Sequence, residues 1–146
     1  MKRIITENGP DGRSRLKTVA EVPAMGAIWE TSAEDWLGRE PDGGALTLDL
    51  PPGHVVARHV VIPPDAEMAA YLAAGIPGLD EKGFHRTPTI DYLILIDGAL
   101  VLELDEGREA LKPGDIVVQR NTNHAWRNPG TTPATCIAIM SRPAEG

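Results

Sequence analysis

Two short polar clusters could carry chemistry in this chain of 146 residues. The first is His85-Arg86-Thr87 with Asp91, and the second is His124-Ala125-Trp126 with Asn128. Alternate side chains of a β-strand share a face, so we expect one face to carry His85, Thr87, Thr89 and Asp91. If the chain folds back so that His124 meets this face, two imidazoles and a carboxylate converge in one cavity. Such groups can ligate a metal or transfer protons.

The elements that must position these clusters are short strands joined by turns. Apolar alternation predicts strands at 3–6, 18–22, 27–31, 45–50, 54–62, 89–96, 100–105, 116–119, 124–127 and 134–140. Asp97-Gly98 is a hairpin signal, and Glu106-Gly107 predicts a second turn. Turns recur about every 8–12 residues, which is typical of an antiparallel sandwich or barrel. The residues 66–74 (AEMAAYLAA) instead predict one short helix that ends at Gly75.

The first third of the chain is less regular than the rest. Ser32 is a candidate N-cap for a helix that Gly38 stops within about one turn. We therefore expect residues 1–45 to form an arm of short strands and loops, and residues 46–142 to form the barrel of a single domain. The arm either crosses to a neighbouring subunit or covers its own barrel, and the sequence favours neither.

Composition limits the classes of partner. The formal net charge is −7 and no basic patch offsets it, which argues against binding to nucleic acid or to an anionic membrane. Cys136 is the only cysteine, so a disulfide framework is excluded and a reducing compartment is expected. The N-terminal residues lack the apolar core of a signal peptide. We expect a cytoplasmic protein that handles a small molecule.

The two clusters resemble the two sequence motifs of the cupin family. In the first motif, the first histidine falls on His85, Thr87 stands at the second histidine, Asp91 stands at the glutamate, and Gly98 closes the motif after six residues. The second motif opens at Pro113-Gly114-Asp115 and ends at His124-x-x-x-Asn128. The resemblance implies an all-β fold, a double-stranded β-helix (jelly-roll) barrel that is usually a homodimer, with a site inside it.

The departures from the motif concern the metal. Cupins typically bind a divalent ion through three histidines and one glutamate, and Thr87 removes one imidazole here. The resemblance leaves His85, Asp91 and His124 as a two-histidine, one-carboxylate set, which suits Fe(II) or Mn(II), with Zn(II) as a further choice. Three ligands bind a metal ion less tightly than four, so a barrel without metal is the alternative.

Three residues are candidates for catalysis beside the metal. Asp91 would serve as a ligand or in acid–base work, and Thr87 would bond a ligand or a metal-bound water. His59 would be a further ligand or a general base if it points inward, but strand parity does not settle its face. Trp126 shares its parity with His124, so it either walls the cavity or packs in the core. The helix at 66–74 either covers the cavity or lies on the surface.

Two classes of function follow. The first is a metal-dependent enzyme that acts on a small oxygenated molecule as a lyase (dehydratase or decarboxylase), as an isomerase or, with Fe(II), as a dioxygenase. The second is a non-catalytic module that binds a small ligand, with or without metal. The sequence favours the enzyme and does not choose among its reaction classes.

Overall fold

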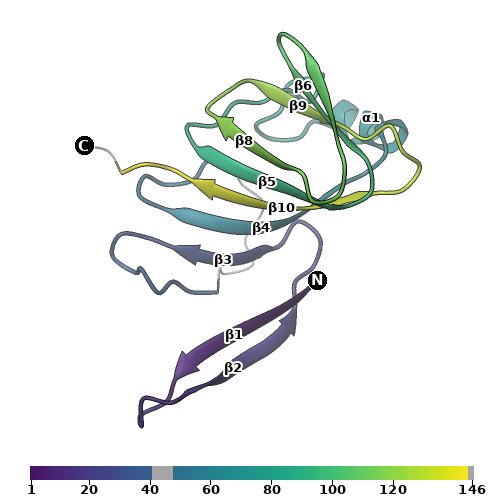
Figure 1. Cartoon of the computed structure of the whole chain (residues 1–146). Coiled ribbons are helices and arrows are strands. Elements are labelled where there is room, and N and C mark those ends of the chain that lie inside the picture. Colours follow the sequence, from purple (N-terminus) through teal and green to yellow (C-terminus); the bar gives the residue numbers. More distant parts are fainter. Residues whose placement is uncertain (41–47, 145–146) are drawn as a thin grey trace.

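The fold is known from a computed structural model, which describes residues 1–40 and 48–144. Ten strands and one helix occur in these ranges (Figure 1). In chain order they are β1 (Lys2–Asn8), β2 (Ser14–Glu21), β3 (Ala27–Thr31), β4 (Val55–Ile62), α1 (Asp65–Ala74), β5 (Ile90–Asp97), β6 (Leu100–Leu104), β7 (Arg108–Leu111), β8 (Ile116–Arg120), β9 (His124–Arg127) and β10 (Ala134–Ser141).

Two sheets form the body of the protein. A five-stranded sheet has the order β3-β4-β10-β5-β8, a three-stranded sheet has the order β7-β6-β9, and every pairing in both is antiparallel. This arrangement confirms the predicted all-β jelly-roll type of fold with one inserted helix. The two sheets share no strand ladder within the described residues, so they form a sandwich that does not close into a continuous barrel.

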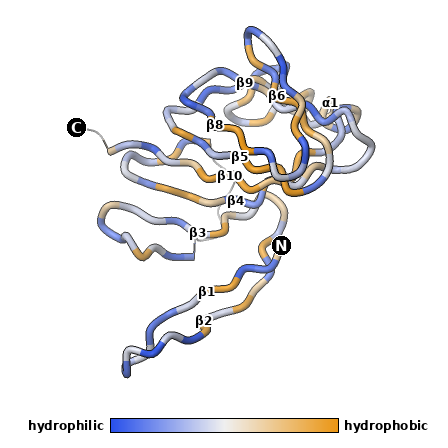
Figure 2. Tube along the Cα trace, in the orientation of Figure 1, coloured by the Kyte–Doolittle hydropathy of each residue, from blue (hydrophilic) through white to orange (hydrophobic). Residues whose placement is uncertain are grey.

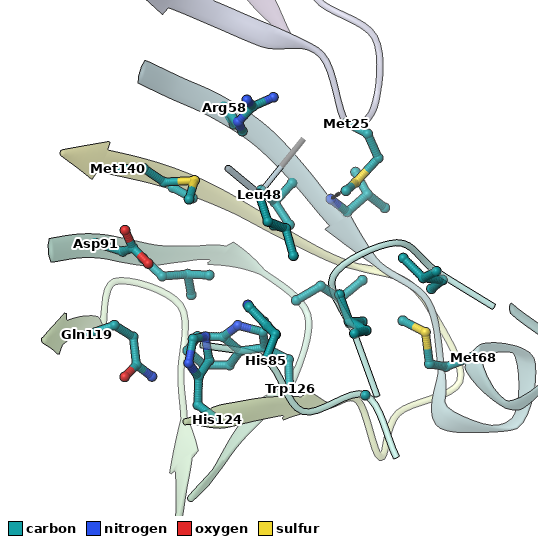
Figure 3. A pocket seen from close by; sticks show the side chains of 18 of the residues that line it. Met25, Leu48, Arg58, Met68, His85, Asp91, Gln119, His124, Trp126 and Met140 are labelled. Carbon is teal, nitrogen blue, oxygen red and sulfur yellow. Dashed lines mark hydrogen bonds between the residues drawn. The ribbon is translucent and has the colours of Figure 1, made fainter. Parts of the chain in front are cut away.

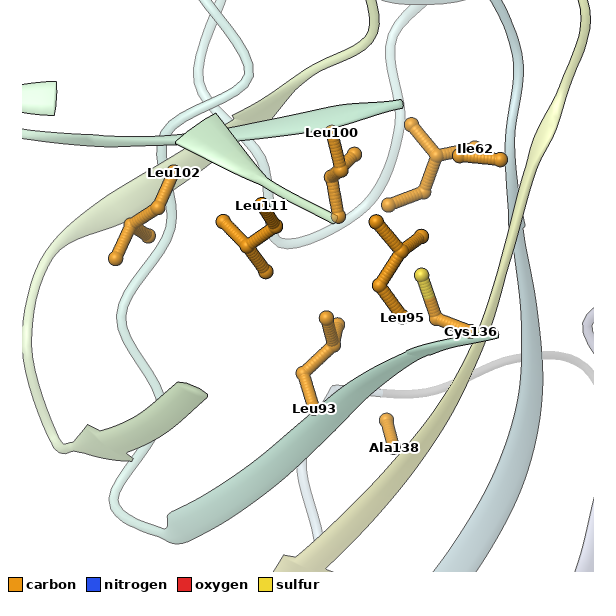
Figure 4. Close-up of a cluster of buried hydrophobic side chains, with 9 residues drawn as sticks. Ile62, Leu93, Leu95, Leu100, Leu102, Leu111, Cys136 and Ala138 are labelled. Carbon is orange, nitrogen blue, oxygen red and sulfur yellow. The ribbon is translucent and has the colours of Figure 1, made fainter. Parts of the chain in front are cut away.

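The hydrophobic core joins the two sheets. Leu93 and Leu95 of β5 and Cys136 of β10 meet Leu100 and Leu111 from the smaller sheet (Figure 4). Leu95 and Cys136 are fully buried, and the apolar residues follow the strands of both sheets in Figure 2. In β10 burial alternates strictly along the strand, as expected when one face meets the core.

Three expectations for local structure need correction. Asp97-Gly98 does not close a hairpin, because β5 pairs with β10 and β8 while β6 pairs with β7 and β9. The chain instead crosses here from one sheet to the other. Gly98 has φ +90°, and a Cβ would lie 2.9 Å from Ala134 Cα, so this crossing requires glycine.

The other two corrections lie before β4. Ser32 does not start a helix: its hydroxyl accepts the amide of Asp35 at 3.1 Å within a turn. Of the strand predicted at 45–50, residues 45–47 lie outside the described residues, and residues 48–50 are not in a strand. The division into an arm and a barrel at residue 45 stays a prediction, although β3 pairs with β4 and so belongs to the main sheet.

Asn128 ties the ends of several elements together. Its side chain is fully buried, donates to the carbonyls of Ile62 and Thr132 at 3.0 and 2.9 Å, and accepts the amide of Gly130. Its backbone amide donates to the Asp65 carboxylate at 2.8 Å at the start of α1. This last residue of the second motif therefore fixes where β4 ends, where α1 begins and how β9 turns toward β10.

The helix α1 confirms the predicted helix and begins one residue earlier, at Asp65. It ends at Gly75, whose φ of +84° stops the helix. None of its residues is fully buried. No helix in the described ranges is both long and apolar enough to cross a membrane.

The strands β1 and β2 form a separate hairpin that extends away from the body (Figure 1). Arg3 holds its base, because the guanidinium donates to the Ile28 carbonyl at 3.0 Å and pairs with Glu40. Most of the hairpin's other residues are exposed, including Ile4, Leu16 and Val19.

Candidate functional site

A mainly apolar pocket of about 190 Å³ lies against the inner face of the five-stranded sheet. Strands β4, β5 and β10 supply one wall (Figure 3). Met68 and Leu72 of α1, with Ile76 and Leu79 from the loop after it, supply another. An apolar cavity of roughly 150 Å³ is enough to hold benzene in a protein core, so this pocket suits a small organic molecule.

The helix therefore contributes a wall of the pocket rather than lying on the outside of the sandwich. Its apolar side chains are only partly buried, since they close the pocket from a solvent-exposed position. Whether α1 moves as a lid stays a prediction.

His85 and His124 face each other across an isolated β-bridge at the pocket. The amide of each donates to the carbonyl of the other at 3.0 Å. Directly opposed residues of such a pair carry their side chains on the same face. The ring centroids are 4.2 Å apart with the planes tilted by 53°, and both rings line the pocket (Figure 3). The expected convergence of the two imidazoles is observed.

The environment keeps both imidazoles neutral. Burial, and then the neighbouring His124, lower the pKa of His85 from 6.5 to about 4. Burial also lowers the pKa of His124, while the Thr122 carbonyl and the Asp91 carboxylate oppose this shift. His124 Nδ1 donates to the Thr122 carbonyl at 2.9 Å, which leaves its Nε2 with a free lone pair. Trp126 packs edge-on against His124, with ring centroids 5.5 Å apart. It lines the pocket, so it is a wall of the cavity, which was one of its two expected roles.

Asp91 reaches the same pocket from β5. Only 9 % of its surface is exposed, and burial raises its pKa, although hydrogen bonds from Thr89 and Thr87 and the charge of His124 act in the opposite direction. The Thr87 hydroxyl lies 2.7 Å from the Thr89 hydroxyl and donates to Asp91 Oδ2 at 3.5 Å. The other oxygen, Oδ1, is buried without a hydrogen-bond partner in the described residues. The predicted common face of Thr87, Thr89 and Asp91 is thus observed, and the two threonines hold the carboxylate.

Gln119 is a site residue that the sequence did not reveal. It is the register partner of Asp91 on β8, it is 3 % exposed, and it lines the pocket. Its Oε1 accepts the Thr122 hydroxyl, and its Nε2 is buried without a partner in the described ranges. The only signal in the sequence was a polar residue at the end of a predicted strand, which does not by itself indicate an inward side chain.

His59 does not belong to the pocket, which corrects its candidacy as a ligand or base. Its ring faces the segment before β3, with Nδ1 3.1 Å from the Pro23 carbonyl and 3.3 Å from that of Val22. The pocket-facing side chains of β4 include Arg58 and Val60, its two neighbours. His59 is a buried histidine bonded to backbone. Thr87 also does not line this pocket, and acts on it through Asp91.

The donor set fits a divalent metal only in part. Two neutral imidazoles lie together, and the carbonyl bond at His124 Nδ1 is the kind of contact that orients a metal-binding histidine. Within residues 1–40 and 48–144, however, no three His, Cys, Asp or Glu side chains group closely enough to hold one ion. Asp91 does not complete the set with His85 and His124 in this arrangement. Metal binding by these three residues stays a prediction.

The family model described as "Cupin domain" (Cupin_2) matches residues 76–140. These residues include both pocket histidines, Asp91 and Gln119. Residues 76–140 are similar to the cupin domain. The match covers a little under half of the chain and runs from the loop after α1 to the end of β10. The matched residues therefore supply the histidines, Asp91 and Gln119 of the pocket, whereas its walls from β4 and α1 precede the match.

Curated relatives align over much the same length. The chain is 46% identical over 67 residues to oryzines biosynthesis cluster protein J of Aspergillus oryzae, which covers 43% of this chain and 37% of that protein. It is 40% identical over 68 residues to the cupin-domain-containing oxidoreductase fogC of Aspergillus ruber, which covers 44% of this chain and 33% of that protein. The chain spans about a third of the length of these relatives.

Solved structures with similar folds include the Cupin_2 domain of an XRE family transcriptional regulator from Enterobacter cloacae. Its identity is 18% and its TM-score 0.43, with 61% of this chain and 82% of that chain covered. The DMSP lyase DddQ from Ruegeria pomeroyi has 19% identity and a TM-score of 0.43, with 60% and 38% covered.

The pKa of His85 predicts how stability depends on pH. Between pH 6.5 and about 4 the unfolded chain binds a proton at His85 that the folded protein does not bind. The free energy of unfolding therefore falls as the pH drops through this window, by on the order of 2 kcal/mol for this residue after allowance for its partial exposure. His85→Asn should remove this contribution in urea titrations at pH 7, 5.5 and 4.

The difference between wild type and variant reports the titration of His85 together with its coupling to His124. His124→Asn should change the pH dependence in the same direction, because burial lowers that pKa too. If the wild-type and His85→Asn curves ran parallel from pH 7 to 4, His85 would not be held neutral by the fold.

Proposed function

We propose that this protein is an enzyme that moves a proton on a small, mainly apolar organic molecule with an oxygen substituent, in a reaction of the lyase or isomerase type. One observation carries this proposal: two neutral imidazoles converge beside a buried carboxylate in an apolar pocket. Groups that can accept and donate protons in a water-poor cavity are the components of general acid–base catalysis.

His124 is the candidate general base. Its Nε2 has a lone pair, and the bond from Nδ1 to the Thr122 carbonyl would strengthen when the ring takes up a proton. Asp91 favours the charged ring as well, since it raises the pKa of His124. These two effects offset part of the cost of charging a buried imidazole.

His85 and Asp91 have complementary roles. His85, with a pKa of about 4, stays neutral and lines the pocket. Asp91, whose pKa burial raises, is suited to hold a proton or share one with the oxygen of the ligand. A base and an acid on one small molecule allow removal of a proton beside a carbonyl, or loss of water.

A metal-dependent oxygenase is the second candidate, and the relatives named as cupin-domain-containing oxidoreductases favour it. In that case His85 and His124 would be the nitrogen ligands, Asp91 the carboxylate ligand, and Fe, Mn or Zn the ion. A bound ion would supply Lewis acidity or, with iron, redox chemistry. A non-catalytic binding module is the third candidate, because the same pocket could hold a ligand without changing it.

Deuterium exchange distinguishes the three candidates and does not require an identified substrate. A panel of small ketones and hydroxyketones is incubated with the protein in D₂O, and exchange at carbon is followed by NMR, with chelator and with added Fe(II), Mn(II) or Zn(II). We expect exchange that survives chelation and falls roughly 10²- to 10⁴-fold in His124→Asn, the range for loss of a general base. His59→Asn, which alters a histidine outside the pocket, is the matched control and should retain activity.

The other outcomes separate the remaining candidates. Exchange or oxygen uptake that appears only with an added metal, together with metal content that is lost in a His85→Ala/His124→Ala double variant, would establish the metal-dependent form. Binding without exchange or oxygen uptake would leave the non-catalytic module. Exchange that is unchanged in His124→Asn would contradict the assigned base.

We further propose that the protein is a homodimer. Exposed apolar side chains gather on the outer face of β5 and β8, where Tyr92 and Ile96 lie beside Ile116 and Val118, each 41–55 % exposed. The hairpin β1–β2 presents a second exposed apolar group, and an isolated two-stranded hairpin is marginally stable without a partner. A second copy that covers the outer β5–β8 face with its hairpin would bury both surfaces.

Light scattering tests this assembly. We expect a mass about twice that of the 15.7 kDa chain, and a mass near one chain for Val118→Lys, which places a charge in the exposed apolar face. Thr132→Lys, at an exposed loop position, is the control and should not change the mass. A wild-type mass of one chain at tens of micromolar protein would contradict the dimer.

A further inference from the structure

Two buried polar side-chain atoms at the pocket, one a donor and one an acceptor, lack a hydrogen-bond partner in the described residues. Gln119 Nε2 is a hydrogen-bond donor, Asp91 Oδ1 is an acceptor when the carboxyl is ionised, and neither has a partner in the described part of the chain. Both residues are at least nine-tenths buried and both line the pocket. Buried polar groups are nearly always hydrogen-bonded in folded proteins, so two unpartnered atoms at one pocket mark the place of a ligand.

The sheet brings the two side chains to one pocket. Asp91 and Gln119 are register partners on β5 and β8, so their side chains leave the sheet on the same face, and Figure 3 draws both among the residues that line the pocket. A chemical group that meets both must accept a hydrogen bond from Gln119 and donate one to Asp91. A hydroxyl does both with a single oxygen atom.

Thr122 fixes which end of the Gln119 amide meets the ligand. Its hydroxyl donates to Gln119 Oε1, which leaves Nε2 as the free end, and its carbonyl accepts from His124 Nδ1. One loop residue before β9 thus orients both the Gln119 amide and the His124 ring. The Thr87 hydroxyl acts similarly on Asp91, because it binds Oδ2 and leaves Oδ1 open.

We propose that Gln119 and Asp91 together recognise a hydroxyl group on an otherwise apolar ligand, with Thr122 as the residue that positions the Gln119 amide. The ligand class is a small alcohol or phenol whose carbon body fills the apolar pocket. This inference rests on the proposed function only in placing a ligand in the pocket, and it makes Gln119 a determinant of specificity rather than a proton carrier.

A pair of matched probes tests the proposal on the whole chain. p-Cresol and toluene differ only by one hydroxyl, and NMR titration gives the Kd of each and follows the side-chain amide signal of Gln119. We expect p-cresol to bind about three- to tenfold more tightly than toluene, the ratio for one net hydrogen bond, and to shift the Gln119 signal. Gln119→Met should bring the ratio to about one while the Kd of toluene stays within about twofold.

Thr122 has a separate readout. Thr122→Val removes the hydroxyl that orients the amide and keeps the carbonyl that holds His124, so it should lower the p-cresol preference, and Thr122→Ser should restore it. A residue with a merely structural role would change both Kd values alike. 4-Methylanisole, whose ether oxygen accepts but cannot donate, should bind more weakly than p-cresol.

Three results would overturn the proposal: equal affinity for p-cresol and toluene in the wild type, a preference that persists in Gln119→Met, or no binding of either probe at the pocket. Equal affinity for 4-methylanisole and p-cresol would show that the ligand donates no hydrogen bond to Asp91, and would contradict the role of Asp91 in the proposal. These results differ from a failure of the proposed function, which is a loss of exchange chemistry. Gln119→Met could abolish the hydroxyl preference whether or not His124 acts as a base.

Discussion

The backbone bridge between His85 and His124 is the constraint on which the site depends. Two reciprocal hydrogen bonds join the segment before β5 to β9, although β5 belongs to the five-stranded sheet and β9 to the three-stranded one. The bridge therefore links the two sheets at one end of the sandwich. It also directs both imidazoles to the same face, because directly opposed residues share a face. The bridge therefore places two polar rings together in a pocket that is otherwise mainly apolar.

Burial gives the site its electrostatic character. Burial disfavours a charged imidazole and so lowers the pKa values of both histidines, while the same burial raises the pKa of Asp91. One environment thus shifts the pKa values of the bases and of the acid in opposite directions. The surrounding threonines then fix individual atoms: Thr122 orients His124 and Gln119, and Thr87 orients Asp91. Each of these three side chains is bonded to the protein at one polar atom and leaves its other polar atom free for a ligand.

Much of the fold could be predicted from the sequence. The alternation of β10 and the helix-forming run of α1 are local signals, and each produced the expected element. The two polar clusters predicted the pairing of His85 with His124, because strand parity and the motif spacing pointed the same way. The crossing at Gly98 was read as a hairpin, since Asp-Gly carries no information on whether the next strand pairs or changes sheet.

The side chains that were predicted wrongly, or not at all, are those whose face depends on a remote partner. Strand parity left the face of His59 open, and the segment at Val22 and Pro23 covers the outer face of β4 and offers its carbonyls to the ring. Gln119 looked like an ordinary strand residue, and only its register with Asp91 places it in the pocket. Both facts are set by long-range pairing that single-sequence patterns do not contain.

NMR titration of the histidine side chains tests the central claim most directly. The nitrogen and carbon shifts should show His124 at pH 7 as the neutral tautomer with its proton on Nδ1, and His85 as neutral down to a pKa of about 4. Both rings should report each other's titration, as expected for rings 4.2 Å apart. If His85 or His124 instead titrated at 6.5 or above, or if His124 carried its proton on Nε2, the two histidines would not form the neutral, oriented pair on which the proposed chemistry rests.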